Sequence, residues 1–237
     1  MPKILPAYSF AFQPIINVVS GEIISFEALV RGEQNETAQS IFKQIAPADM
    51  HHFDELLRLN AIPLAAKLGI QCRLNLNLLP GSLAESDAAI LSTLSVAKEH
   101  GIQAEFITLE ITEQEIIHDF KRFIDAIDVA RSCGMGFSID DFGAGYAGLN
   151  MLAEFQPDTI KLDMSLVRDI ETRGPRQAIV RGIARTCNDL GIDIIAEGVE
   201  TVAEYWWFRE EGIALFQGFL FAKPGFEHLP MAFYPKL

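Results

Sequence analysis

Cysteine and long apolar runs are both scarce in this 237-residue chain. The three cysteines, Cys72, Cys133 and Cys187, are an odd number without CxxC spacing, which argues against a disulfide framework and indicates reduced thiols. No stretch approaches the roughly 18 apolar residues of a membrane span, and the N-terminus lacks the apolar run of a signal peptide. We therefore expect a cytoplasmic protein with no membrane span.

Basic residues are also few: 19 Lys and Arg stand against 32 Asp and Glu, a net charge of −13. Long DNA or RNA is held by neutralising phosphates with Lys and Arg, so polymeric nucleic acid is not an expected partner. A small phosphate ester remains possible if cations are supplied locally, and metal ions are the obvious source.

The chain is expected to form a single domain over residues 1–237, because no linker or low-complexity tract divides it. Apolar runs of strand length are Phe10–Val19, Glu22–Val30, Cys72–Leu79, Phe106–Thr112, Gly136–Asp140, Thr159–Leu162, Asp193–Ala196 and Leu215–Phe221. Between them, segments of helical period cover Asp54–Leu68, Leu83–His100, Gln114–Cys133, Ala178–Leu190 and Val202–Glu211, each followed by a glycine. This alternation predicts an α/β fold, a (β/α)8 TIM-like barrel or, less well matched, an open doubly wound sheet.

One connection breaks the alternation. Ser20-Gly21 joins the first two predicted strands and is too short for a parallel crossover. We therefore expect a modified barrel whose first strand pair is antiparallel.

Polar residues interrupt the apolar runs near the carboxyl ends of the predicted strands, where barrel active sites are built. They are Glu27, Asn77, Glu110, Asp140, Asp141, Lys161, Glu197 and Gln217. Each one alone has an ordinary explanation as a helix cap, a turn residue or half of a salt bridge. Together, five carboxylates against one ammonium give a local charge of −4, which two divalent cations would cancel. Oxygen ligands suit magnesium or manganese, so the sequence predicts a two-metal site that activates water for phosphoryl displacement.

The same residues lie in motifs that resemble the EAL-domain cyclic di-GMP phosphodiesterase family. The signature is EALVR at Glu27–Arg31, and further matching segments follow in order: FQPI at Phe12–Ile15, NLLP at Asn77–Pro80, LEITE at Leu109–Glu113, DDFGAGYAGL at Asp140–Leu149, IKLD at Ile160–Asp163, AEGVET at Ala196–Thr201 and QGFLFAKP at Gln217–Pro224. The resemblance covers almost the whole chain.

The resemblance implies a modified (β/α)8 barrel and hydrolysis of cyclic di-GMP to linear pGpG by a water activated by two Mg²⁺ or Mn²⁺ ions, which lowers the level of a bacterial second messenger. The implied metal ligands are Glu27, Asn77, Glu110, Asp140, Asp141 and Glu197; the implied catalytic residues are Glu27, Lys161 and Glu197; the implied substrate contacts are Gln13, Leu29, Arg31 and Gln217; and the implied supporting residues are Glu113, Glu200 and Asp163. By analogy with the family, we also expect a homodimer.

Some positions depart from the family pattern. Leu79 stands where a serine usually precedes the proline, and the loop after Asp141 carries Ala144, Ala147 and Gly148 in place of hydroxyl residues. The implied metal ligands are all present, which favours an enzyme. Two alternatives remain: a protein that binds cyclic di-GMP or a protein partner without hydrolysis, and a metal hydrolase of another phosphate ester.

Overall fold

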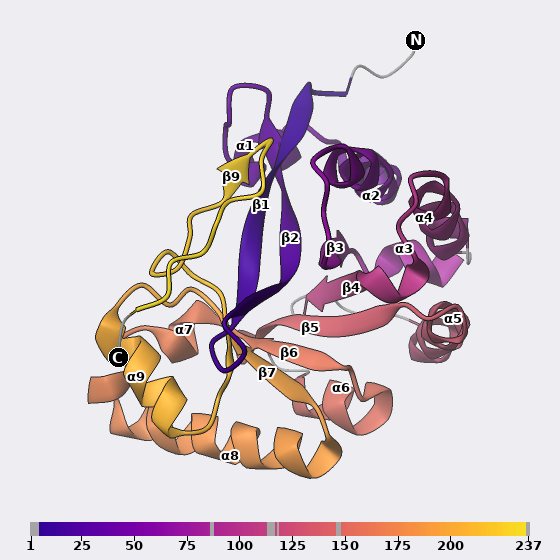
Figure 1. The fold of residues 1–237 in the computed structure, drawn as a ribbon. Helices are drawn as coiled ribbons and strands as arrows, with labels where there is room; N and C mark the ends of the chain where they lie inside the picture. Colours follow the sequence, from indigo (N-terminus) through magenta and orange to yellow (C-terminus); the bar gives the residue numbers. More distant parts are fainter. Residues whose placement is uncertain (1–4, 86–87, 113–116, 118, 146–147, 236–237) are drawn as a thin grey trace.

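The computed structural model describes residues 5–85, 88–112, 117, 119–145 and 148–235, and strands alternate with helices along them (Figure 1). The strands are β1 (Tyr8–Asn17), β2 (Glu22–Gly32), β3 (Arg73–Leu78), β4 (Ile107–Thr112), β5 (Gly136–Phe142), β6 (Thr159–Leu162), β7 (Asp193–Ala196), β8 (Leu215–Phe216) and β9 (Gly225–Phe226). The helices are α1 (Ala38–Phe42), α2 (Met50–Lys67), α3 (Gly81–Glu85), α4 (Ala88–Glu99), α5 (Phe120–Ser132), α6 (Gly148–Phe155), α7 (Met164–Val167), α8 (Gly174–Leu190) and α9 (Val202–Glu210). None of these helices is both long and apolar enough to cross a membrane.

The sheet closes into a barrel. Neighbouring strands follow the order β2-β3-β4-β5-β6-β7-β8-β1, and β1 pairs back to β2. The pairs from β2 to β8 are parallel, whereas β1 is antiparallel to both β2 and β8. The barrel and its antiparallel first pair are confirmed, and the open sheet is excluded.

The turn between β1 and β2 explains the antiparallel start. Asn17 accepts hydrogen bonds on its side-chain oxygen from the backbone N–H groups of Val19 and Ser20, and its carbonyl accepts one from Gly21. Gly21 has a φ of 74°, a conformation that glycine adopts without strain. The chain therefore reverses directly, and no helix separates the two strands.

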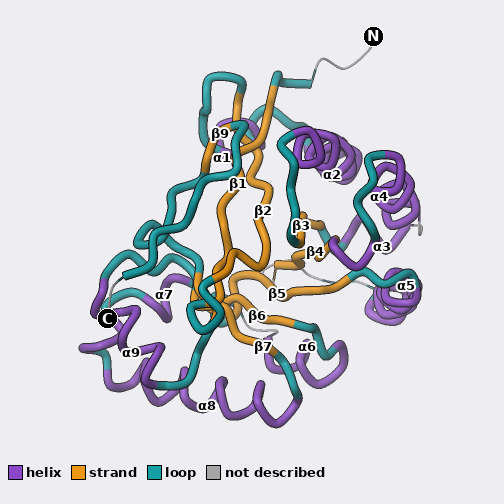
Figure 2. The backbone as a smooth tube through the Cα atoms, in the orientation of Figure 1, coloured by secondary structure: helices purple, strands orange, loops and turns teal. Residues whose placement is uncertain are grey.

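Helices cover most of the outside of the barrel, but the side next to β1 is different. There the C-terminal segment runs back in extended form, and β9 pairs with Ala11 and Phe12 of β1 (Figure 2). The main hydrophobic core lies between the strands and the helices. A small second cluster, Ile15, Ile195 and Leu215, fills one end of the barrel interior.

Several element boundaries differ from the sequence prediction. The segment Leu83–His100 contains two helices, α3 and α4, and α6 was not predicted at all. The predicted strand Leu215–Phe221 ends at Phe216. The N–H of Gln217 still donates to Ala196, the last residue of β7, but its carbonyl accepts from Val199 in the segment after β7. The predicted helix Gln114–Cys133 begins, within the described residues, at Phe120, where Asp119 caps the N–H of Arg122.

Candidate metal centre

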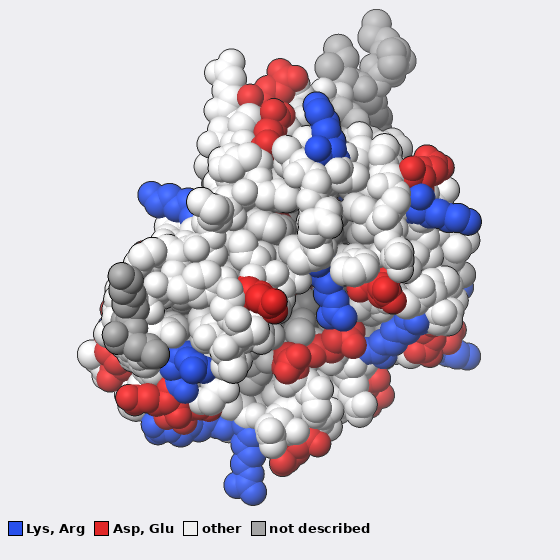
Figure 3. Space-filling view, viewed as in Figure 1, with Lys and Arg blue, Asp and Glu red and all other residues white. Residues whose placement is uncertain are grey.

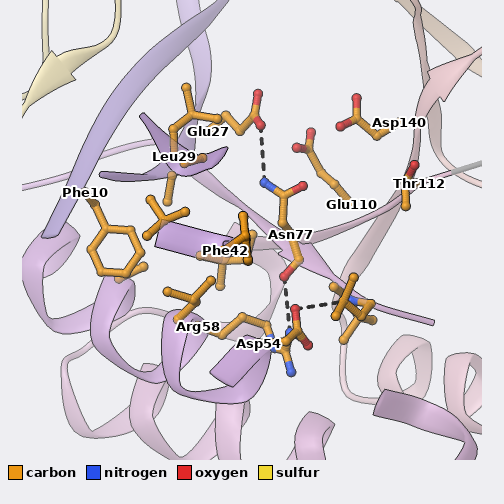
Figure 4. A pocket seen from close by; sticks show the side chains of 18 of the residues that line it. Phe10, Glu27, Leu29, Phe42, Asp54, Arg58, Asn77, Glu110, Thr112 and Asp140 are labelled. Carbon is orange, nitrogen blue, oxygen red and sulfur yellow. Dashed lines mark hydrogen bonds and ion pairs between the residues drawn. The ribbon is translucent and has the colours of Figure 1, made fainter. Parts of the chain in front are cut away.

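The polar residues predicted from the strand ends share the inside of the barrel. Glu27 of β2, Glu110 of β4 and Asp140 of β5 point inward, because the carboxylate of each lies within 3.4 Å of the buried Lys161 Nζ. Gln217 directly follows β8, and its Nε2 reaches Glu27 Oε2 at 2.8 Å, so its side chain enters the same space. Figure 4 shows the head groups of Glu27, Glu110 and Asp140 directed toward one another.

Lys161 of β6 lies at the centre of these carboxylates and is fully buried. Its Nζ is 2.9 Å from Glu27 Oε2 and 3.0 Å from Asp140 Oδ1. It is 3.4 Å from both Glu110 Oε2 and Glu197 Oε2. Three acids from β2, β4 and β5 and a fourth that directly follows β7 therefore converge on one ammonium group.

Glu27 is the most heavily hydrogen-bonded of the acids. Besides Lys161, Gln217 Nε2 donates to its Oε2 at 2.8 Å and Asn77 Nδ2 donates to its Oε1 at 3.3 Å. Only 4% of Glu27 is exposed. All three partners are donors, so both carboxylate oxygens of Glu27 accept hydrogen bonds from the protein.

A bulge in β5 brings two consecutive aspartates to the same rim. Ile139 pairs with Ile160 of β6, but the next pair is Phe142 with Leu162, so Asp140 and Asp141 together stand opposite the single residue Lys161. Asp141 has a φ of 54°, the left-handed region that non-glycine residues seldom adopt. In a regular strand Asp141 would face away from Asp140.

Burial and repulsion between carboxylates raise the pKa values of two of these acids, Glu110 and Glu197. Burial raises the pKa of Glu110 well above its ordinary value, Lys161 lowers it, and the carboxylates of Glu27 and Asp140 raise it further. Burial also raises the pKa of Glu197 to about 8, with Lys161 opposing and Asp140 adding to the shift. One ammonium therefore does not compensate for so many carboxylates.

The same two causes, burial and neighbouring carboxylates, shift the pKa values of Asp141 and Lys161. Burial raises the pKa of Asp141 to about 6, and the charges of Asp140 and Asp163 add to the shift. Burial alone would lower the pKa of Lys161, but Asp140, the largest of four acidic contributors, helps to hold it well above its ordinary value. The acidic neighbours thus favour the protonated form of Lys161.

The arrangement fits divalent metal ions. Among the described residues, two groups bring carboxylate oxygens within 4.8 Å of one another: Glu27 with Glu110 and Asp140, and Asp140 with Asp141 and Glu197. Asp140 belongs to both groups. The buried oxygens Asp140 Oδ1 and Glu197 Oε2 accept no hydrogen bond, and Lys161 Nζ is the cation within ion-pair distance of both. They therefore have room for a further cation.

A cavity of about 400 Å³ opens beside the acids. Glu27, Glu110, Asp140 and Glu197 line one end, and the rest of the wall is largely apolar, with Leu29 among the lining residues (Figure 4). A cavity that is mostly apolar with a few convergent polar groups is typical of a small-molecule site.

Three of the four predicted substrate contacts, Gln13, Arg31 and Gln217, lie outside this lining. Gln13 is buried, and its Nε2 donates to the carbonyl of Ala222 at 3.1 Å. Arg31 donates to the carbonyl of Val30 at 2.8 Å, and burial lowers its pKa. Their substrate roles stay predictions.

Two of the predicted supporting residues make local contacts in the described part of the chain. Asp163 caps α7 by accepting from Ser165 N–H, and Glu200 forms an ion pair with Arg168 at 2.8 Å. Glu113 lies outside the described residues.

Sequence reasoning missed Asn75, which is buried and donates to Glu110 Oε1 at 2.8 Å. The signal was present, because Asn75 and Asn77 are two residues apart and therefore face the same side of β3. In the predicted strand Cys72–Leu79, nearness to the carboxyl end pointed to Asn77 as a site residue and passed over Asn75.

Gly218, next to Gln217, has no room for a side chain, because a Cβ there would overlap the backbone of Val199. We expect Gly218→Ala to lower the free energy of unfolding by about 2 kcal/mol, measured by urea denaturation. Gly182→Ala is the control: it lies within α8 with nothing within 4 Å of the added Cβ, so it should stabilise the protein by about 0.5–1 kcal/mol. Equal effects of both variants would contradict this packing.

The sequence model of the EAL domain matches residues 7–224. The chain belongs to the EAL domain family. One curated relative of this EAL chain is the blue light- and temperature-regulated antirepressor BluF of Escherichia coli K12. The two are 36% identical over 228 residues, and the match covers 96% of this chain and 57% of BluF. The chain is 34% identical over 218 residues to the cyclic di-GMP phosphodiesterase PdeR of the same organism, covering 86% of this chain and 32% of PdeR. The chain therefore spans little more than half, or less, of these relatives.

Solved EAL structures share its fold. A standalone versatile EAL protein from Vibrio cholerae O395, in a cyclic di-GMP-bound form, has a TM-score of 0.90 at 41% identity and covers 97% of both chains. Klebsiella pneumoniae BlrP1, in a manganese and cyclic di-GMP complex at pH 9.0, has a TM-score of 0.89 at 41% identity over 96% of this chain and 58% of BlrP1. These likenesses cover the whole barrel.

Proposed function

We propose that this EAL chain hydrolyses cyclic di-GMP to linear pGpG with two divalent cations. The observation that carries the proposal is the pair of carboxylate groups that share Asp140 at the mouth of the barrel. The V. cholerae neighbour was solved with bound cyclic di-GMP, and BlrP1 with both manganese and cyclic di-GMP, which supports the same ligands here.

In this proposal Glu27, Asn77, Glu110 and Asp140 hold one ion, and Asp140, Asp141 and Glu197 hold the other. Oxygen donors of this kind suit Mg²⁺ or Mn²⁺. Bound there, the ions supply Lewis-acid polarisation of the phosphate and lower the pKa of water. Two divalent charges balance the charge of −4 that five carboxylates and Lys161 carry.

The chain's own residues divide the remaining work. Lys161 stays protonated and stabilises the negative charge that develops on the phosphate. Glu197 has the most exposed side chain of the four acids paired with Lys161, 30% against 15% or less, and orients water at the rim. Gln217 fixes Glu27 through the 2.8 Å hydrogen bond. Gln13, Leu29 and Arg31 are proposed to hold the dinucleotide.

The partners proposed for the chain follow from its charge. On the face shown in Figure 3 the basic side chains form separate patches between acidic ones, a poor surface for a long polyanion. A small cyclic dinucleotide needs only the local cations of the cavity. The homodimer stays a prediction.

The decisive experiment is incubation of the purified chain with cyclic di-GMP. With Mg²⁺ or Mn²⁺ we expect pGpG to accumulate, and with excess EDTA the rate should fall below detection because the carboxylates then have no cation beyond Lys161 to orient the phosphate. Chromatography of the products measures both. No pGpG with any divalent ion would refute the proposal.

The second candidate is a protein that binds cyclic di-GMP or a protein partner without cleaving it. The 36% identity to BluF, which is named an antirepressor, favours this alternative. The same incubation separates the two, since saturable binding in calorimetry without product identifies a receptor. The complete set of acids around Lys161 favours the enzyme.

A further inference from the structure

Helix α2 carries a buried ion pair close to the metal centre but separate from it. Arg58 Nη1 bonds to Asp54 Oδ2 one helical turn away. Arg58 is 1% exposed and Asp54 5%. The pair is not among the eight polar residues predicted from the strand ends, although both members lie along the wall of the cavity (Figure 4).

The pair holds the connection between β3 and α3 at three points. Arg58 Nη1 donates to the carbonyl of Asn77 at 3.2 Å. Asp54 accepts from the N–H of Leu79 at 3.2 Å and from the hydroxyl of Ser82 at 2.9 Å. Asn77 is the residue whose amide reaches Glu27. The contacts therefore hold the backbone of a proposed metal ligand and the residues that follow it.

Stability alone does not account for such a pair. Taking two charges out of water costs several kcal/mol per ion, and apolar residues of similar volume are often as good or better for stability. Here the cost is increased, because Arg58 Nε and Nη2 are buried without a hydrogen-bond partner. Apolar residues such as Leu57, Ala61 and Phe10 line the same wall and would accept an apolar replacement.

Direct contact with a ligand does not account for it either, because the unpartnered nitrogens are inaccessible to solvent. The pair reaches the site only through the backbone that it binds. We propose that Asp54 and Arg58 are positioning residues that fix the β3–α3 connection, so that Asn77 presents its side chain to the metal beside Glu27. This inference rests on the proposed function for the metal role of Asn77.

The test replaces both charges by apolar groups, Asp54→Leu with Arg58→Met, in the full chain. We expect a thermal unfolding midpoint close to that of the parent, because the double replacement leaves no unpaired charge and removes the two buried Arg58 nitrogens that have no partner. Calorimetric Mn²⁺ affinity should fall by about 10–100-fold, as is typical when the support of a ligand is lost. Without metal, the amides of Ser82 and Leu83 should exchange faster, although their acceptors, Leu79 and Pro80, are untouched by the substitutions.

Two further variants keep the test informative if the apolar double variant does not fold: a conservative replacement of Arg58 and a matched control pair. A single nitrogen of Arg58, Nη1, donates to both Asp54 and Asn77. Arg58→Lys keeps one cationic donor group beside Asp54, so an affinity loss of less than about 10-fold is expected. Arg181→Met with Glu211→Leu is the matched control, since this exposed pair, 2.6 Å apart, joins α8 to the end of α9 away from the acids. It should leave Mn²⁺ affinity unchanged.

Asn77→Ala separates failure of this inference from failure of the proposed function. If Asn77→Ala weakens Mn²⁺ binding and the apolar double variant does not, the positioning role is wrong and the metal assignment stands. If Asn77→Ala binds Mn²⁺ like the parent, the metal assignment of Asn77 is wrong. Unchanged exchange at Ser82 and Leu83 overturns the positioning role in either case.

Discussion

Glu27→Gln should reduce the rate of pGpG formation by about 10³-fold or more, equivalent to several kcal/mol of transition-state stabilisation. The carboxylate accepts from Lys161, Gln217 and Asn77 at once. A glutamine of the same size offers one acceptor oxygen and places an NH₂ group against donors. It also removes one negative charge from the proposed metal ligands. The measurement is product formation at saturating Mn²⁺.

Glu22→Gln is the matched control, because Glu22 begins the same strand at its exposed end. It removes one negative charge without touching the acids around Lys161, so its rate should stay within about twofold of the parent. A Glu27→Gln protein that folds normally by circular dichroism and retains a tenth of the parent's rate would place the reaction elsewhere.

The set of acids could be predicted from the sequence because a strand reveals which residues share a face. Glu110 and Lys161 interrupt apolar runs, and a lone buried charge at such a place is costly. Their recurrence on successive strands pointed to one common space before any contact was known. The antiparallel pairing of the first two strands could also be predicted, since Ser20-Gly21 is too short for a parallel crossover.

Contacts between distant segments could not be predicted in this way. The bulge that turns Asp141 toward Asp140 depends on the pairing of β5 with β6, which a single strand does not reveal. The early end of β8 reflects the backbone hydrogen bond that Val199, in the segment after β7, donates to Gln217. The pair formed by Asp54 and Arg58 looks like an ordinary i, i+4 surface pair until α2 is packed against the barrel.

Lys161→Met should make the stability of the chain depend on divalent metal. The substitution leaves the buried acids without their shared cation, a change that costs about 3–5 kcal/mol when a buried pair is broken. For a chain of this length, each kcal/mol lowers the unfolding temperature by about 2–4 °C, so in EDTA we expect a fall of about 6–20 °C. Differential scanning calorimetry measures it.

Mn²⁺ should reverse most of that loss. A ligand that binds only the folded state stabilises it in proportion to its affinity, and carboxylates that have lost Lys161 repel one another more and attract a divalent ion more strongly. The gain in unfolding temperature on adding Mn²⁺ should therefore be larger for Lys161→Met than for the parent. Lys98→Met, an exposed substitution on α4, should show the parent's gain. Equal gains in all three proteins would mean that the ions bind away from the acids around Lys161. Because this readout is stability, it tests the metal centre even if the chain binds the dinucleotide without cleaving it.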